Sequence, residues 1–108
     1  MAQNFRRYVQ NNVGTSASTV FTADSYDTVV GISVSNVETS SILVDVFIND
    51  GSNDIYLVKE APVPVGSSLQ VLDGGAKVVV QSGDALKVKS SVASSADVWV
   101  SAVDAIST

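Results

Sequence analysis

The sequence predicts an all-β protein that folds as a single antiparallel β-sandwich of about eight strands, preceded by an N-terminal arm. Three observations support this fold class. Apolar and polar side chains alternate over short segments, turn-forming residues separate these segments at a spacing of roughly ten residues, and no segment longer than about two helical turns shows helical periodicity. Aromatic residues make up only 6% of the 108 residues, so we expect a core built mainly from Val, Ile, Leu and Ala in thin layers of strands.

The N-terminal arm is predicted to span residues 1–12, and the sandwich domain residues 13–108. Residues 1–20 contain Arg6 and Arg7 but no acidic residue, whereas the rest of the chain contains four Lys and all eleven acids. The N-terminal segment therefore has a charge of +2 and the remainder a charge of −7, which together give the formal net charge of −5.

Phe5, Arg6, Arg7 and Tyr8 are the candidate partner-binding residues. Aromatic side chains and Arg are enriched where proteins bind each other, and this arm is otherwise too polar to fold alone. We expect the four residues to reach an acidic or apolar patch on a neighbouring protein. The alternative is that the segment forms a first edge strand, packed on its own domain.

Four strands are predicted in the first part of the sandwich. They span residues 19–23, 28–34, 42–48 and 55–59. In the second of these strands, alternation divides the side chains between two faces, with Val30, Ile32 and Val34 on one and Gly31 and Ser33 on the other. The third and fourth strands form a hairpin, because a polar segment centred on Gly51 separates them.

Residues 61–66 interrupt the strand pattern, because Pro62 and Pro64 lack a backbone donor for the ladder. We expect the chain to cross here from one sheet to the other.

Four more strands follow the crossover, over residues 67–72, 76–80, 85–90 and 98–103. Two tight turns are predicted between them, one at Asp73, Gly74 and Gly75 and the other at Ser82, Gly83 and Asp84. The resulting pattern is typical of a β-sandwich, but it fits an Ig-like and a jelly-roll topology equally well.

Trp99 in the last strand is out of phase with Val98 and Val100. In a regular strand the indole ring and the two valines therefore occupy opposite faces. Trp99 is then either buried between the sheets or offered to a partner.

The composition argues against catalysis. The chain has no His, the usual general base near neutral pH, and no Cys, so that Ser activation by His, thiolate chemistry and zinc sites are not expected. Most Asp residues sit at or beside predicted strand ends, where Asp is favoured for making turns. They are Asp24, Asp27, Asp50, Asp54, Asp73, Asp84, Asp97 and Asp104. We therefore expect no catalytic residues, no cofactor and no enzymatic activity.

Asp50 and Asp54 are the weak candidates for a metal site. Together with the residues between them they cluster oxygen atoms that Ca²⁺ would accept. The segment lacks the loop spacing and the terminal Glu of an EF-hand, so a solvated hairpin loop is the preferred interpretation and no metal is expected.

Nucleic acid and membranes are not expected as partners. Nucleic-acid binding draws most of its affinity from Lys and Arg, and the body of this chain is acidic. No apolar run approaches the roughly 20 residues that span a bilayer, and no apolar segment of an export signal follows the basic pair at the N-terminus. The absence of Cys fits assembly in a reducing compartment.

Residues 61–88 resemble small virion proteins of tailed bacteriophages. The resembling pattern is Pro-x-Pro-x-Gly, then a strand ending in Leu-Asp-Gly, then a strand that leads to Ser-Gly-Asp and Leu-Lys-Val. The resemblance extends over residues 28–103 and leaves the arm outside. It implies a β-sandwich accessory protein of the particle, either a capsid decoration or cement subunit or a component of the neck or tail.

The leading hypothesis is thus a non-enzymatic structural protein of the virion, assembled in the host cytoplasm. It would form a homo-oligomer, a trimer, that binds other virion proteins such as the major capsid protein and stabilises the particle. The alternative is a carbohydrate- or receptor-binding β-sandwich module. Stacking on a sugar would require at least one aromatic ring outside the core, so the position of the rings distinguishes the two hypotheses.

Overall fold

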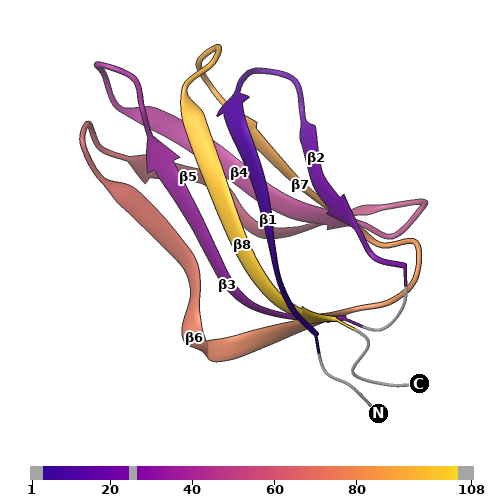
Figure 1. The fold of residues 1–108 in the computed structure, drawn as a ribbon. Helices are drawn as coiled ribbons and strands as arrows, with labels where there is room; N and C mark the ends of the chain where they lie inside the picture. Colours follow the sequence, from indigo (N-terminus) through magenta and orange to yellow (C-terminus); the bar gives the residue numbers. More distant parts are fainter. Residues whose placement is uncertain (1–3, 25–26, 105–108) are drawn as a thin grey trace.

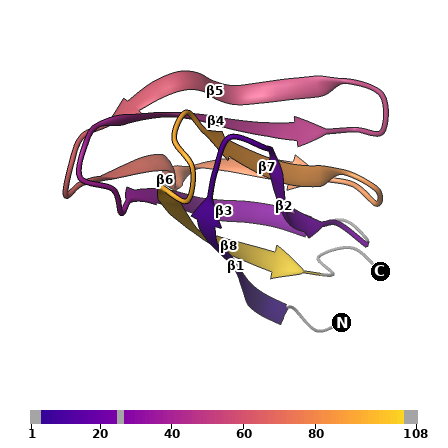
Figure 2. The same ribbon diagram turned by 90° about the horizontal axis from the view of Figure 1, so that it is seen from above.

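The computed structural model describes residues 4–24 and 27–104, which form eight strands in two sheets (Figures 1 and 2). The strands are β1 (Asn4–Val13), β2 (Ser18–Thr22), β3 (Asp27–Asn36), β4 (Ile42–Asn49), β5 (Asp54–Val63), β6 (Ser68–Val80), β7 (Ala85–Ser90) and β8 (Ala96–Asp104). Sheet A has the order β1-β8-β3-β6 and sheet B the order β2-β7-β4-β5, with antiparallel pairing throughout. The described residues contain no helix, and hence none that could cross a membrane. The predicted all-β sandwich is confirmed.

The strand order identifies the sandwich as a jelly roll. Strands pair in a nested series, β1 with β8, β2 with β7, β3 with β6 and β4 with β5, and successive pairs alternate between sheets A and B. This is the arrangement of a double-sheet jelly roll. An Ig-like sandwich places its first two strands in one sheet, whereas β1 and β2 lie in different sheets here.

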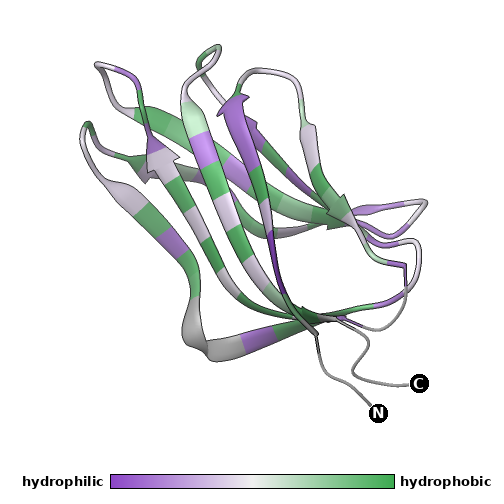
Figure 3. Cartoon of the chain, viewed as in Figure 1, coloured by the Kyte–Doolittle hydropathy of each residue, from purple (hydrophilic) through white to green (hydrophobic). Residues whose placement is uncertain are grey.

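The core lies between the sheets and is mainly aliphatic, as the composition predicts. Hydrophobic and polar residues alternate along β3 and β8 (Figure 3), so that each strand turns one apolar row inward. The fully buried side chains of largest volume are Ile32, Ile42, Leu86, Val13, Val29, Val34, Val44, Val46, Val63, Val80, Val88 and Val100.

One inward position on β3 differs from the prediction. Val29 is buried, while Val30 is only half-buried. The pairing of β3 with β8 and with β6 shifts register between Val29 and Gly31, which is the mark of a β-bulge. The extra residue changes the phase of the alternation, so that Val29 and Ile32 point inward on either side of the bulge.

The tight turn predicted at Asp73, Gly74 and Gly75 is wrong. β6 runs through these residues as one continuous strand, which bends sharply in Figure 1. Val29 of β3 pairs with Val78, whereas Gly31 pairs with Asp73. Two steps along β3 thus match five along β6, and the irregularity absorbs the glycine pair without reversing the chain.

The arm predicted over residues 1–12 also needs correction. From Asn4 onward this segment is β1, an edge strand of sheet A, in regular register with β8 from Asn4↔Asp104 to Gln10↔Val98. The backbone groups of the segment find partners on β8, which is a stronger arrangement than solvation as a free arm. The edge-strand alternative is therefore the observed one, and residues 4–12 belong to the sandwich.

The segment that contains Pro62 and Pro64 was predicted to interrupt the strands and to cross between the sheets. The strand continues through its first residues, and the crossover follows after Val63. Pro62 is part of β5, where its missing N–H is tolerated because β5 is an edge strand. The chain leaves sheet B after Val63 and enters sheet A at Ser68. The predicted crossover between sheets is confirmed.

Candidate interaction surface

The outer faces of the two sheets differ in chemistry. The outer face of sheet B is charged, with Lys59, Lys87 and Lys89 among its side chains. Its aromatic residues cover each other: the ring of Phe47 lies 4.9 Å from that of Tyr56, and Lys59 Nζ lies 4.8 Å from the Tyr56 centroid. The outer face of sheet B also exposes Leu43 and Tyr56. The outer face of sheet A exposes more of its large apolar side chains, namely Phe5, Val9, Val79 and Trp99, with Arg7 and Asp97 beside them. This larger exposed apolar area makes sheet A the candidate interaction surface.

A row of three apolar side chains and one threonine crosses the four strands of sheet A near the chain termini. Phe5 of β1 pairs with Val103 of β8, Val103 with Thr28 of β3, and Thr28 with Val79 of β6. We call these four residues the Phe5 row. Its two ends are the most exposed, Phe5 at 78% and Val79 at 62%, while Val103 and Thr28 are half-buried. Exposed apolar side chains that are aligned on the outer face of a sheet are typical of a surface that a partner covers.

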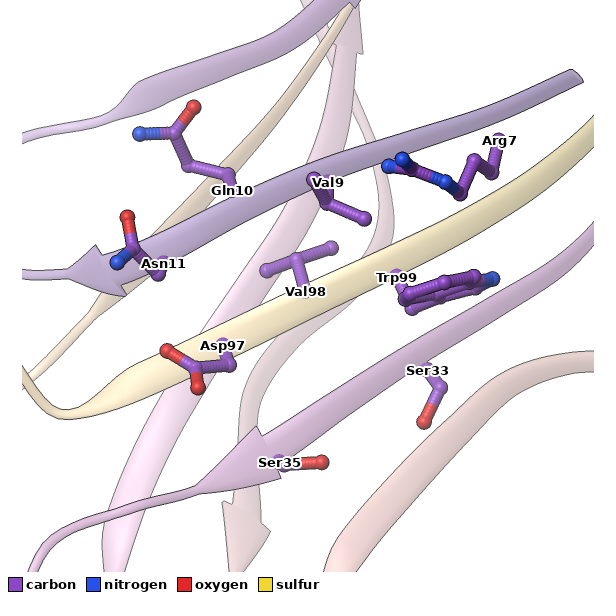
Figure 4. A pocket seen from close by; sticks show the side chains of 9 residues that line it. All are labelled: Arg7, Val9, Gln10, Asn11, Ser33, Ser35, Asp97, Val98 and Trp99. Atoms are coloured by element: carbon purple, nitrogen blue, oxygen red, sulfur yellow. The ribbon is translucent and has the colours of Figure 1, made fainter.

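A hollow lies beside the Phe5 row, around Trp99 (Figure 4). Its volume is about 620 Å³, and it is lined by Arg7, Val9, Gln10, Asn11, Ser33, Ser35, Asp97, Val98 and Trp99. Trp99 is 52% exposed, while Val98 and Val100 are buried. The ring and the valines do occupy opposite faces of the sheet, and Trp99 stands on the outer one. We call this feature the Trp99 hollow.

The four candidate binding residues do not all lie on one surface. Phe5 and Arg7 are exposed, and the Arg7 guanidinium lies 5.4 Å from the centroid of the Trp99 ring, a cation–π contact. Arg6 is exposed as well. Tyr8 is half-buried and stacks on Phe21 at 4.3 Å between the ring centroids, inside the sandwich. Tyr8 therefore packs inside the sandwich, whereas Phe5 and Arg7 lie on the outer face of sheet A.

The weak metal candidates are held by their own loop. Asp50 Oδ1 accepts the backbone N–H groups of Asn53 at 2.8 Å and Ser52 at 3.0 Å, which lowers the pKa of this carboxyl. Asn49 Nδ2 donates to Asp54 Oδ1 at 2.7 Å. In the part of the chain that the structure describes, no three acidic side chains come together as a metal site would require. The hairpin loop is organised by hydrogen bonds.

The sequence did not single out Val79 and Val103 as part of a surface. Each lies in a strand that also supplies the core, and single apolar residues in such strands are ordinary. Their alignment with Phe5 depends on strand order, since β1, β8, β3 and β6 are far apart along the chain. The one sequence signal for Val79 is that it neighbours Val80 in the same strand. Because neighbours in a strand face opposite sides, one of these two valines had to be exposed, and Val79 is the exposed one.

Comparison with known proteins gives a likeness of fold. No protein-family model matches the sequence, and no curated protein matches it. A chain in the acid-stable capsid structure of the Helicobacter pylori bacteriophage KHP30 aligns with a TM-score of 0.62 at 12% identity, covering 95% of this chain and 87% of that one.

Two further solved structures are similar. A chain of Bacillus endospore appendages, which form disulfide-linked pili, aligns with a TM-score of 0.57 at 14% identity and covers 94% of this chain and 84% of that one. A pentameric capsid protein isolated from metagenomic phage sequences has a TM-score of 0.48 at 23% identity, with 93% of this chain covered and 59% of that one. The fold of this chain is therefore similar to folds found in phage capsid and pilus structures.

Proposed function

We propose that this chain is a non-enzymatic structural protein of a bacteriophage virion, and specifically a capsid decoration or cement protein that stabilises the particle. The proposal rests on the Phe5 row, which crosses sheet A with the exposed apolar side chains Phe5 and Val79 at its two ends. The likeness of the jelly roll to a chain of the KHP30 capsid supports it. We do not propose a disulfide-linked pilus, although one of the similar chains belongs to such an assembly. This sequence contains no cysteine that could form the links.

The mechanism of a cement protein is burial of surface. Covering apolar area gains about 25 cal/mol per Å², and the Phe5 row offers this area on paired strands of sheet A. Arg7 lies on the same strand and the same face as Phe5, in a segment without acidic residues. Its charge favours an acidic patch on the capsid protein and disfavours basic surfaces.

The neck and the tail are the alternative locations within the particle. A decoration protein coats the shell in many copies, whereas neck and tail positions occur at one vertex. The copy number of the chain in the particle and its location there therefore distinguish decoration from a neck or tail position, and no variant is needed for this.

The experiment uses particles grown from a phage genome that contains this sequence. Quantitative mass spectrometry of gradient-purified particles, with cryo-electron microscopy, is expected to find the chain in many copies on the shell. Its absence from purified particles would refute a virion role, and a location at one vertex would refute decoration.

Two variants test the proposed surface. Phe5→Ser and Arg7→Ala should each lower occupancy on the particle, the first at all salt concentrations and the second mainly at low salt, where charge attraction is strong. Tyr56→Ser, an exposed aromatic on sheet B, is the matched control and should attach normally. Full occupancy of the Phe5→Ser variant would show that another surface faces the particle.

A further inference from the structure

The Trp99 hollow has one aromatic wall and small neighbours. Figure 4 shows the indole between Arg7 on one side and Ser33 on the other. The side chains opposite β8 on β3 are small, because Ser33 pairs with Trp99 and Ser35 with Asp97. No large residue of β3 therefore covers the ring on that side, and more than half of the Trp99 surface remains exposed.

The polar groups around the ring have unused hydrogen-bonding capacity. Ser33 Oγ accepts a hydrogen bond from Gln70 Nε2 at 3.0 Å, and its own O–H can still donate. Asp97 Oδ1 accepts the backbone N–H of Asn12 at 3.1 Å, which uses one of about four lone-pair positions on the carboxylate. The Asn11 amide adds both a donor and an acceptor at the rim.

We propose that the Trp99 hollow is a carbohydrate-binding site for a neutral sugar. A pyranose ring has an apolar C–H face, which matches the open face of the indole, and a rim of hydroxyl groups, which matches Asp97, Ser33 and Asn11. The volume of about 620 Å³ lies within the range of roughly 300–1,000 Å³ typical of small-molecule sites. The site is distinct from the Phe5 row and does not depend on the proposed virion role.

The charges of the hollow favour a sugar over a protein side chain. An apolar protein surface laid over the ring would take Asp97 out of water without a partner, which is costly. Hydroxyl groups replace the lost water at the carboxylate. The same carboxylate, together with the net charge of −5, disfavours acidic sugars, and Arg7, the one cation lining the hollow, is already held against Trp99.

Trp99 is the only tryptophan of the chain, so its fluorescence reports directly on this site. Purified protein would be titrated with D-glucose, D-galactose, D-mannose and N-acetyl-D-glucosamine, each up to about 50 mM, because ligands of this size bind with Kd near 1 mM. At least one sugar is expected to give a saturable shift of the emission. The free amino sugar glucosamine and glucuronate serve as charged comparisons, and glucuronate should bind more weakly than the neutral sugar.

Variants test whether the sugar binds at the Trp99 hollow. Binding to the variants is measured by ligand-observed NMR, because tryptophan fluorescence is lost when Trp99 is replaced. Trp99→Ala should weaken binding at least tenfold, and Trp99→Phe should retain part of it. Asp97→Asn keeps an oxygen for the Asn12 N–H and should weaken binding about three- to tenfold. Tyr56→Ala, the matched aromatic control with its own cation contact, should bind normally.

The results separate this proposal from the virion role. Failure of all four neutral sugars to shift the fluorescence, together with an empty glycan array, would refute the site. Binding that survives in the Trp99→Ala variant would place it elsewhere and equally overturn the proposal. The occupancy of the Phe5→Ser variant on particles is a separate measurement. The sugar site can therefore be refuted while the virion role stands, and the virion role can be refuted while the sugar site stands.

Discussion

At the residue scale, two leucines show how position in the sheet decides the role of a side chain. Leu86 of β7 points into the core and is 1% exposed, whereas Leu43 of β4 is 43% exposed on the outer face. Leu86→Ala should lower the free energy of unfolding by about 2–5 kcal/mol, through lost burial and a residual cavity. Leu43→Ala should cost less than about 1 kcal/mol.

Urea denaturation of both variants checks this prediction, because the chemical change is the same in each. Equal losses of stability would contradict the assignment of inner and outer faces. The backbone N–H of Leu43, which donates to Ser91 Oγ at 3.0 Å, is unchanged by the substitution and does not confuse the comparison.

Asp50 gives the fold a dependence on pH. The Asn53 and Ser52 N–H groups lower the pKa of its carboxyl in the folded state. A lowered pKa stabilises the fold at pH values above the unfolded pKa, and this contribution is lost as the pH falls through the folded value. The loss is therefore expected below about pH 4.

Asp50→Asn keeps an acceptor for the two N–H groups but removes the titration. Between about pH 5 and pH 3, the urea midpoint of the natural chain should fall further than that of the variant. Identical pH dependence of the two midpoints would show that the loop carboxylate does not contribute.

At the scale of elements, the predicted number of strands agrees with the structure, but two of the predicted strands do not correspond to separate observed ones. The sequence predicted eight strands, and the described residues contain eight. One predicted pair, residues 67–72 and 76–80, is a single strand, and β1 is the edge strand that the sequence offers only as the alternative to an arm. Asp73, Gly74 and Gly75 have the chemistry of a tight turn, but pairing with the whole length of β3 keeps β6 extended. Tertiary pairing outweighed local turn preference here.

β1 gives only a weak strand pattern because neither of its faces is uniformly apolar. Tyr8 turns inward and stacks on Phe21, while Phe5 and Val9 are exposed on the outer face. Alternation identifies a strand most clearly when one face carries all the apolar residues. In β1 they are divided between the two faces, and the outward Phe5 contributes to the candidate surface.

The edge of β5 contains a residue in an unfavourable conformation. Glu60 has a φ of 53°, and its N–H donates to Asp45 Oδ1 at 2.7 Å. The left-handed region costs a residue with a Cβ roughly 1–2 kcal/mol. Glu60→Gly should therefore raise the free energy of unfolding by about 1 kcal/mol.

Glu60→Ala is the control, since it removes the same charge but keeps the Cβ. Thermal and urea unfolding of the two variants should show a gain for glycine only. A gain of the same size for alanine would assign the effect to charge rather than to backbone strain.

At the scale of the whole molecule, the candidate surface could not be obtained from the sequence. Fold class, crossover and most strands follow from local patterns. The Phe5 row instead requires that four distant strands lie in one order and one register, and the two topologies left open by the sequence order them differently. The phase of Trp99 was readable, but only the folded sheet shows which face is the outer one.

We expect the protein to be a homo-oligomer. One copy presents only a narrow apolar row, so attachment to a particle gains from linked copies. Light scattering is expected to give a trimer, three times the 11.2 kDa of the chain. Phe5→Ser should remain trimeric, because the row is proposed to face the particle; a monomeric variant would mean that the row joins copies of this chain, and a monomeric natural chain would refute the trimer.

The nested pairing of strands also determines the order in which the chain can fold. β4 and β5 are joined by a short hairpin and can pair early, whereas β1 must wait for β8, the last of the eight described strands in chain order. Closing such long loops is slow. Folding should therefore begin with the β4–β5 hairpin and proceed outward, and the edge that bears Phe5 becomes structured only after β8 has been synthesised.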